Sequence, residues 1–407
     1  MNGSSAQRCH TVVVGLGSWG AQALWRLAER GVDVVGLERF DLGHALGAAH
    51  GVTRLFRVAC LEHPGLAAMA RRSAELWREL GGLAGIELLR TTGAVMIGPP
   101  DSQVVAGTLA AAQAGGVDVE VLDAAAVAAR FPAFAGLDGA DLEVVDPLAG
   151  LTYPEAGTAA AIDAARAAGA RVLDGVRVEA IEDAGGAGPA GALRVVLAGG
   201  AQLSCERVVV CAGAWTRRLV DVPVQPRRVP LSWFEPAGGA PEASAPAAPS
   251  PMAPGGALHL DKLPAFVRQL PDGHAVWGHG GDDAAGFAVK IGLHDDGVVF
   301  DDADPERLDR AIRPERDTAL LSAEVARWFE GIDPRPLSTV PCMYTSSPDH
   351  LFLLGAVPGR PGVFVAAGDS GHGFKHATAI GDALAALATG ADPGLNLSYL
   401  SPARPLL

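Results

Sequence analysis

The sequence predicts an α/β fold (α+β overall), with one domain around a parallel sheet and a second around a large, mainly antiparallel sheet. A chain of 407 residues is too long for one simple core. Strand–glycine turn–helix patterns stand at both ends, over 11–38 and 362–390, and strand-like segments dominate the middle. We therefore expect both termini to build the first domain. The expected boundaries are 1–85, 150–220 and 335–407 for the first domain, and 86–149 and 221–334 for the second.

The N-terminal pattern reads as strand, glycine turn, helix, strand. An apolar run at 11–14 leads into three glycines, a helix is expected over 21–30, and a second apolar run at 32–37 ends at Glu38. The three glycines are Gly15, Gly17 and Gly20. This complete unit is typical of a Rossmann-like dinucleotide-binding domain, and a purely structural glycine turn is the alternative.

Each of these residues has a defined task in such a domain. Gly15 permits a tight turn, Gly17 lets backbone amides approach a pyrophosphate, and Gly20 lets the helix pack on the strand. The helix N-terminus faces the phosphates with its partial positive charge. Glu38, at the end of the second strand, is placed to accept hydrogen bonds from ribose hydroxyls.

The rest of the chain alternates between helical and strand patterns. Helices are expected over 63–82, 158–168 and 315–331. Strands are expected within 87–98, 171–183, 192–200, 201–216, 263–270, 274–279 and 287–295. Residues 236–256 are rich in proline, alanine, glycine and serine, and we interpret them as a mobile surface insertion, more readily a tolerated loop than a lid.

Composition and charge exclude several classes. The net charge of −14 argues against a nucleic-acid-binding protein, and no apolar run is long enough for a membrane span. The odd set of cysteines has no CxxC pair, which argues against a disulfide framework and a cysteine-rich zinc site. We expect no metal site and a cytoplasmic location. The cysteines are Cys9, Cys60, Cys205, Cys211 and Cys342.

Cys342 lies in the segment PCMYT, which we expect to be short and irregular. Taken alone, this cysteine is compatible with a buried filler, a metal ligand, a nucleophile or an attachment point for another group. The cysteine count weakens only the metal.

Several motifs together identify a family. The sequence resembles the monomeric sarcosine oxidase family, which includes N-methyltryptophan oxidase and pipecolate oxidase and belongs to the D-amino acid oxidase superfamily. The resemblance covers nearly the whole chain and implies a Rossmann-like FAD-binding domain beside a substrate domain. The resemblance rests on the motifs VVVGLGSWG (12–20), HGVTRLFR (50–57), CAGAW (211–215), VKIGLH (289–294), PCMYT (341–345) and GDSGHGFKH (368–376).

The resemblance implies FAD as the cofactor, bound covalently through its 8α carbon to the sulfur of Cys342. The DSGHG turn is then expected to bring backbone amides to the flavin. The cofactor-binding residues that the resemblance implies are Gly15, Gly17, Gly20, Glu38, Arg39, His50, Val178, Gly213, Trp215, Cys342, Gly371 and Gly373.

The resemblance also implies the reacting groups. Lys290 matches a lysine that promotes the reaction of reduced flavin with O2, where a fixed positive charge stabilises developing superoxide. A solvent-facing strand lysine is the alternative for Lys290. Arg54 and His294 are the other two catalytic candidates, one beside the flavin ring and one lining the site.

Substrate binding is implied for a second group. Arg57 and Lys375 match the two cations that hold a substrate carboxylate, and an ion pair with a neighbouring acid is the alternative for Arg57. A structural role is the alternative for the histidines. The expected substrate-binding residues are Arg57, Lys375, Tyr344, Trp277 and His372.

Three positions depart from the family pattern, namely Cys60 and Trp277 where tyrosine is usual and Val267 where methionine is usual. They fall on the amine side of the substrate, so sarcosine itself is not the expected substrate. The implied activity is oxidation of a secondary (N-methyl or cyclic) amino acid to an imine, with O2 reduced to H2O2 by a monomer. A dehydrogenase with another electron acceptor, an NAD-dependent enzyme and a non-catalytic flavoprotein are the alternatives.

Overall fold

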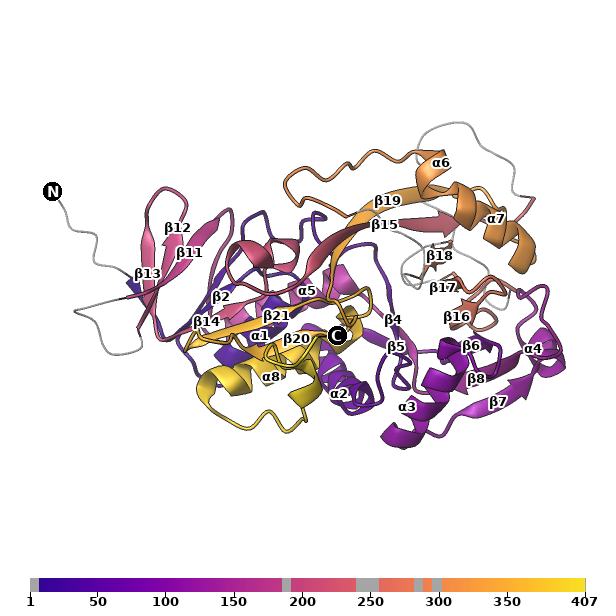
Figure 1. The fold of residues 1–407 in the computed structure, drawn as a ribbon, viewed down its shortest axis with the longest axis horizontal. Coiled ribbons are helices and arrows are strands. Elements are labelled where there is room, and N and C mark those ends of the chain that lie inside the picture. The colour runs from indigo at the N-terminus through magenta and orange to yellow at the C-terminus, as the bar shows by residue number, and fades with distance from the viewer. Residues whose placement is uncertain (1–6, 185–191, 239–255, 282–287, 295–301, 407) are drawn as a thin grey trace.

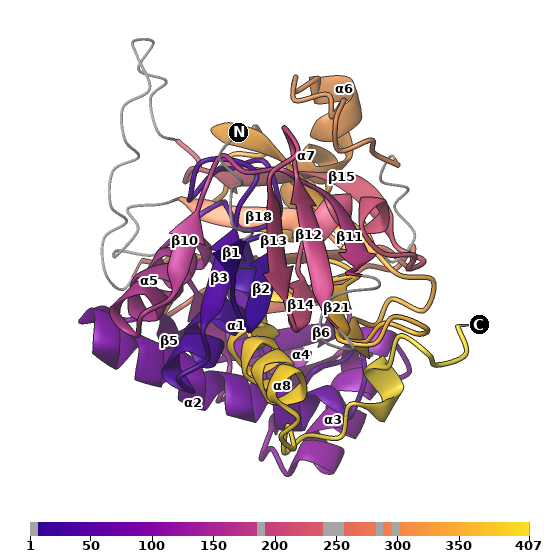
Figure 2. The same ribbon diagram turned by 90° about the vertical axis from the view of Figure 1, so that its left-hand side faces the viewer.

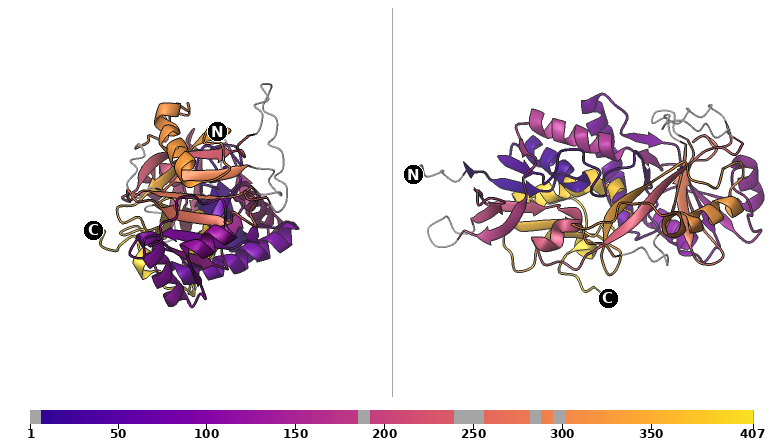
Figure 3. Two further views of the ribbon diagram at one scale, coloured as in Figure 1. Left: turned by 90° about the vertical axis from the view of Figure 1, so that its right-hand side faces the viewer. Right: turned by 90° about the horizontal axis from the view of Figure 1, so that it is seen from above.

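The computed structural model describes residues 7–184, 192–238, 256–281, 288–294 and 302–406. Two large sheets lie toward opposite ends of an elongated molecule (Figure 1), and the view from above gives the same arrangement (Figure 3). The mixed α/β architecture with a large antiparallel sheet is as predicted.

The first sheet has six strands, all parallel except the last pair. Its central strands β2 and β3 are buried along their whole length, which explains their continuous apolar sequence. In spatial order the strands are β10 (Arg171–Leu173), β3 (Val34–Leu37), β2 (Thr11–Val14), β14 (Arg207–Val210), β21 (Val363–Ala367) and β20 (Leu353–Ala356).

Helices cover one face of this sheet and a smaller sheet covers the other (Figure 2). The helices are α1 (Ser18–Glu29), α2 (Leu66–Ala84), α5 (Pro154–Ala167) and α8 (Ala377–Thr389). The smaller sheet consists of β1 (Gln7–Arg8), β13 (Gln202–Cys205), β12 (Leu193–Leu197) and β11 (Val178–Asp183).

The second large sheet has eight strands, antiparallel except for the pair β16–β6. In order these are β19 (Ser338–Ser346), β15 (Gln225–Phe234), β18 (Val289–Leu293), β17 (Ala275–His279), β16 (Ala265–Gln269), β6 (Ala94–Gly98), β8 (Leu142–Asp146) and β7 (Glu120–Asp123). The helices near it are α3 (Thr108–Gly115), α4 (Ala124–Arg130), α6 (Pro314–Asp317) and α7 (Ala319–Trp328). A small sheet of β4 (Arg54–Phe56), β9 (Gly150–Thr152) and β5 (Leu89–Thr91) lies between the two halves.

Two local expectations are wrong. Cys342 lies within the nine-residue strand β19, opposite Val229 of β15, and not in an irregular stretch. Proline is tolerated there because β19 is an edge strand. The helix expected over 315–331 is interrupted at Thr318, because the carboxylate of Asp317 is fixed by Arg228 and by the backbone N–H of Arg313.

The proposed domain boundaries assign β19 to the first domain, because this strand lies after residue 335, but β19 pairs with β15 in the second large sheet. The interpretation of 236–256 as an insertion falls, for residues 239–255, outside the part of the chain that the structure describes.

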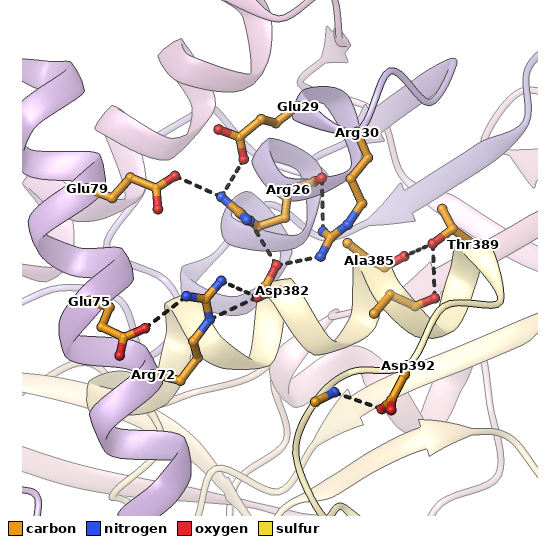
Figure 4. A network of polar contacts seen from close by, with 12 residues as sticks. Arg26, Glu29, Arg30, Arg72, Glu75, Glu79, Asp382, Ala385, Thr389 and Asp392 are labelled. Carbon is orange, nitrogen blue, oxygen red and sulfur yellow. Dashed lines mark hydrogen bonds and ion pairs between the residues drawn. The ribbon is translucent and has the colours of Figure 1, made fainter.

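Asp382 on α8 joins three helices of the first half (Figure 4). Its carboxylate accepts hydrogen bonds from Arg26 (2.9 Å) and Arg30 (2.6 Å) of α1 and from Arg72 (3.0 Å) of α2. Burial raises the pKa of Asp382, but the three guanidinium groups outweigh this effect and hold that pKa below its usual value.

Replacing Asp382 by alanine should lower the free energy of unfolding at pH 7 by about 3 kcal/mol, because it leaves neighbouring cations without their shared anion. A carboxylate with a lowered pKa stabilises the fold above its usual pKa and loses this contribution as the pH falls. Denaturant unfolding of Asp382→Ala and wild type should therefore differ less at pH 3 than at pH 7. The exposed Asp163 on α5, changed to asparagine, is the control, and an equal loss in both variants would contradict the role of Asp382.

Candidate active site

A cavity of about 570 Å³ opens at the carboxyl ends of β2, β14 and β21. This is the edge of a parallel sheet where ligands of such folds bind. Seven of the predicted cofactor-binding residues line it: Gly15, Gly17, Glu38, Arg39, Val178, Gly213 and Trp215.

The glycine turn has the geometry that the predicted roles require. Gly15 has φ +87°, and a Cβ there would lie 2.6 Å from the carbonyl oxygen of Cys211. A Cβ on Gly20 would lie 1.8 Å from the carbonyl oxygen of Gly15, so α1 packs against the turn only without a side chain. A Cβ on Gly17 would meet no described atom within 4 Å, because this residue faces the cavity.

Glu38 is buried at the end of β3. Its carboxylate accepts hydrogen bonds from the backbone N–H groups of Leu16 (2.7 Å) and Phe40 (3.1 Å) and lies 3.4 Å from His44. Burial raises the pKa of Glu38, but the hydrogen bonds and His44 outweigh this effect and hold that pKa below its usual value. The group is therefore an anion at neutral pH. Across the cavity, the buried hydroxyl of Thr158 has no hydrogen-bond partner among the described residues.

A smaller pocket of about 120 Å³ adjoins this cavity and shares Ser18, Ala48, Tyr344 and Asp369 with it. Strands β4, β15, β17 and β19 and the turn at 369–373 build its wall. Ten of the predicted residues line it: Arg54, Arg57, Trp277, His294, Cys342, Tyr344, Gly371, His372, Gly373 and Lys375.

Two buried cations share one buried carboxylate at the end of this pocket. Arg57 donates to Glu62 at 2.5 Å, and the Nζ atom of Lys375 lies 3.3 Å from the same oxygen. The ion pair that was the alternative for Arg57 therefore exists. It uses only one arm of the guanidinium group, because Nε and Nη1 of Arg57 have no hydrogen-bond partner among the described residues.

The electrostatics of this cluster follow from burial and mutual proximity. Burial raises the pKa of Glu62, but Arg57 and Lys375 outweigh it and hold that pKa well below the usual range. Burial lowers the pKa of Lys375, and Glu62 partly offsets the shift. Burial also lowers the pKa of His372 to about 4, so this imidazole is neutral at pH 7.

Three predicted residues do not line either cavity. Gly20 packs inside the fold, and His50 is buried beside Arg54. Lys290 is fully buried and lies behind the wall, where its Nζ donates to the carbonyl oxygens of Gly51 (2.6 Å) and Thr53 (2.8 Å). The alternative of a solvent-facing lysine is therefore wrong.

Cys342 lines the smaller pocket at its border with the cofactor cavity, because its neighbour Gly47 lines the larger cavity. Its sulfur lies 3.9 Å from Nη2 of Arg54 and 3.8 Å from the carbonyl oxygen of Gly47. Burial raises the pKa of this thiol, while Arg54 and Lys290 act in the opposite direction.

The three residues that depart from the family pattern do not all line the pocket. Val267 and Trp277 line the pocket. Cys60 instead lies beneath it, where its thiol donates to the carbonyl oxygen of Arg57.

Sequence reasoning missed several carboxylates of the site, among them Glu62, Glu155 and Asp369. Glu62 follows the arginine motif by five residues, and Asp369 opens the DSGHG turn, so position within the motifs was the available signal. No motif position indicated Glu155, because it lies in α5 and reaches the turn at Gly51 from a distant part of the sequence.

The comparisons with known proteins agree with this geometry. The profile of the family described as "DAO: FAD dependent oxidoreductase" matches residues 10–387. The chain belongs to this family. It is an FAD-dependent oxidoreductase, as the sequence predicted.

Relatives with known names cover nearly the whole chain. It is 30% identical over 393 residues to a monomeric sarcosine oxidase of Streptomyces avermitilis, covering 93% of this chain and 92% of that protein. It is 29% identical to an N-methyl-L-tryptophan oxidase of Yersinia pestis, covering 97% and 98%.

Among solved structures, NikD, described as an unusual amino acid oxidase, superposes with a TM-score of 0.78 at 23% identity, covering 98% and 99% of the two chains. An L-proline dehydrogenase from P. horikoshii superposes with 0.75 at 19% identity, covering 98% and 97%. These two similarities show the shared fold.

The residues of the cavity fit FAD. The open face of Gly17, the ionised Glu38 and the unpartnered hydroxyl of Thr158 are groups that a pyrophosphate, a ribose and a polyol chain would engage. Within the described ranges, no helix has the length and apolar character to cross a bilayer, and no cluster of His, Cys, Asp and Glu is placed to hold a metal ion.

Two glycines of the turn should respond differently to alanine. Gly20→Ala forces Cβ into the Gly15 carbonyl and should destabilise the apoprotein by about 1–3 kcal/mol. Gly17→Ala should leave apoprotein stability nearly unchanged but weaken FAD binding, because its Cβ enters the cavity. Thermal unfolding of apoprotein and FAD titration separate the two effects, and equal FAD affinity in Gly17→Ala and wild type would contradict the assignment of the cavity.

Proposed function

We propose that the chain is an oxidase of a secondary (N-methyl or cyclic) amino acid, forming an imine and passing two electrons to O2 as H2O2. The relatives near 30% identity are named oxidases of sarcosine and N-methyl-L-tryptophan, which supports an oxidase over a dehydrogenase. The amine loses its C–H and N–H hydrogens as two protons and two electrons. O2 accepts the two protons and the two electrons and becomes H2O2, so the reaction is balanced.

The observation that carries the proposal is the incompletely paired cation cluster. Arg57 and Lys375 are buried with one carboxylate, Glu62, between them, and two donor atoms of Arg57 lack described partners. Two cations and one anion leave one positive charge, which a substrate carboxylate neutralises.

The remaining walls orient the amine end. Val267, Trp277 and Leu231 exclude water and favour an apolar N-substituent or ring. Neutral His372 adds no positive charge there, so the amine is free to react as a neutral base. When bound, FAD supplies the electron acceptor for the C–N bond. Buried behind the wall, Lys290 is the group that would supply a positive charge for the reaction with O2, while burial itself lowers the pKa of its amino group.

The covalent attachment of FAD to Cys342 belongs to the same proposal. A thioether bond replaces the S–H bond of Cys342 and one C–H bond of the flavin methyl group, so it is a two-electron oxidation whose electrons leave through O2. The position of the sulfur at the junction of the cavities supports it. A monomer in the cytoplasm is also proposed, supported by the described cysteines being free thiols and by the name of the sarcosine oxidase relative.

The activity is tested by anaerobic bleaching of the flavin with matched pairs of amines. Pipecolate and proline should bleach it faster than piperidine and pyrrolidine, which lack the carboxylate, and sarcosine, other N-methyl amino acids and glycated amino acids complete the panel. Arg57→Gln should reduce kcat/KM for the acids by about 10- to 100-fold, because it removes charge-assisted hydrogen bonds. No bleaching by any member, or equal rates with and without the carboxylate, would contradict the proposal.

The attachment is tested by acid precipitation. Wild-type protein should keep its yellow flavin in the pellet, whereas Cys342→Ala should release it to the supernatant because the thioether is absent. Cys60→Ala, which removes a buried thiol outside the cavity, is the matched control and should keep the flavin bound. Free flavin from wild-type protein would exclude the covalent bond.

A further inference from the structure

A strained turn lies between the cofactor cavity and Lys290. The N–H of Thr53 donates to the carbonyl oxygen of Gly51 at 2.8 Å, which closes a γ-turn around Val52. Val52 has φ +66°, a conformation that is unfavourable for a β-branched residue, and Gly51 before it has φ +92°. Such turns persist only where the surroundings fix them.

Opposite charges fix the two sides of this turn. Glu155, in the first turn of α5, accepts hydrogen bonds from the N–H groups of Gly51 (2.7 Å) and Val52 (3.0 Å). On the other side, Lys290 donates to the carbonyl oxygens of Gly51 (2.6 Å) and Thr53 (2.8 Å). The turn therefore presents its donors to an anion and its acceptors to a cation.

We propose that Glu155 is a positioning residue for Lys290, acting through the turn at 51–53 to hold the two carbonyl oxygens that bind the lysine ammonium. This inference rests on the proposed function for its link to O2, but the contact itself does not. Pro154 begins α5 directly before Glu155 and pre-orders the first helical turn, so the carboxylate has a rigid base.

The position of Lys290 depends on such support. It is fully buried, with its Nζ 5.2 Å from the ring centroid of Trp233 and 5.9 Å from that of Trp277. Aromatic faces attract a cation but do not fix its direction, whereas two carbonyl oxygens do. If the turn relaxed, both oxygens would move and the ammonium group would lose its place behind the pocket wall.

The charge of Lys290 depends on the same carboxylate. Burial lowers the pKa of Lys290 well below its usual value, Arg54 lowers it further, and Cys342 and Glu155 act in the opposite direction. His50 lies within range of the same charge, but burial lowers its pKa to about 4, so it is neutral at pH 7. A Cys342 sulfur bound as a thioether no longer ionises, which leaves Glu155 as the anion of this group.

Lysine NMR on the holoenzyme measures this effect without reference to activity. The chain has three lysines, Lys262, Lys290 and Lys375, so ¹³Cε-lysine labelling gives three signals that Lys→Arg variants assign. Glu155→Gln should move the titration of Lys290 to lower pH, because the ammonium form loses its anion, and should leave Lys262 unchanged. Asp163→Asn on the exposed face of α5 is the matched control and should change none of the three.

Stopped-flow kinetics then tests the functional consequence. Glu155→Gln should slow reoxidation of the reduced flavin by about 10-fold or more while leaving anaerobic reduction nearly unchanged. Adding Val52→Gly, which removes the strain at φ +66°, should restore part of the loss, because glycine keeps the turn without the clamp. If Glu155→Gln alone folds poorly, the reoxidation rate is measured on this double variant instead.

The outcomes separate this inference from the proposed function. An unchanged Lys290 titration together with unchanged reoxidation in Glu155→Gln overturns the role of Glu155. If Lys290→Met reoxidises as fast as wild type, the role of Lys290 in the proposed function is wrong, and the NMR titration alone then supports or overturns the clamp by Glu155.

Discussion

The burial of three cations is the constraint around which the candidate active site is organised. Arg57, Lys290 and Lys375 are at most 4% exposed in a chain whose net charge is −14. A buried charge without partners costs several kcal/mol, so each needs specific acceptors. Glu62 supplies one acceptor for two of them, and backbone carbonyl groups supply the rest. Two donor atoms of Arg57 have no acceptor among the described residues, and this deficit is the basis of the proposed selectivity for an anion.

The two halves of the molecule are joined where these cations lie. The long strands β15 and β19 run from the eight-stranded sheet to the cofactor cavity, and β19 carries Cys342 and Tyr344 to the junction. The turn at 51–53 comes from the other half and meets Lys290 of β18. The two cavities are therefore lined by residues from both halves of the molecule, so neither half forms them alone.

Local sequence patterns predicted most of the fold, because the conformations of turns and buried strands depend mainly on residues that are close in the sequence. The glycine turn and the apolar strands of the first sheet depend on neighbours in the sequence, and the structure has both. The strand character of Cys342 was missed because Pro341 argued against it, and only pairing with β15, more than a hundred residues away, explains it. Glu155 was missed for the same reason, since its hydrogen bonds to Gly51 and Val52 span a sequence separation of about a hundred residues.

Lysine is rare in this chain, and most of its lysines lie at the candidate active site. The chain contains 32 lysines and arginines together, of which only three are lysine, and two of the three are buried at the active site. The third, Lys262, is exposed, and arginine supplies the other side-chain cations of the chain. Lys290 directs one compact ammonium group to two carbonyl oxygens, and the rings of Trp233 and Trp277 lie near it. An ammonium group also changes its pKa on burial far more readily than a guanidinium group, so its charge responds to one nearby carboxylate. In the role that we propose, the charge of Lys290 is adjustable, and Glu155 is the carboxylate placed to adjust it.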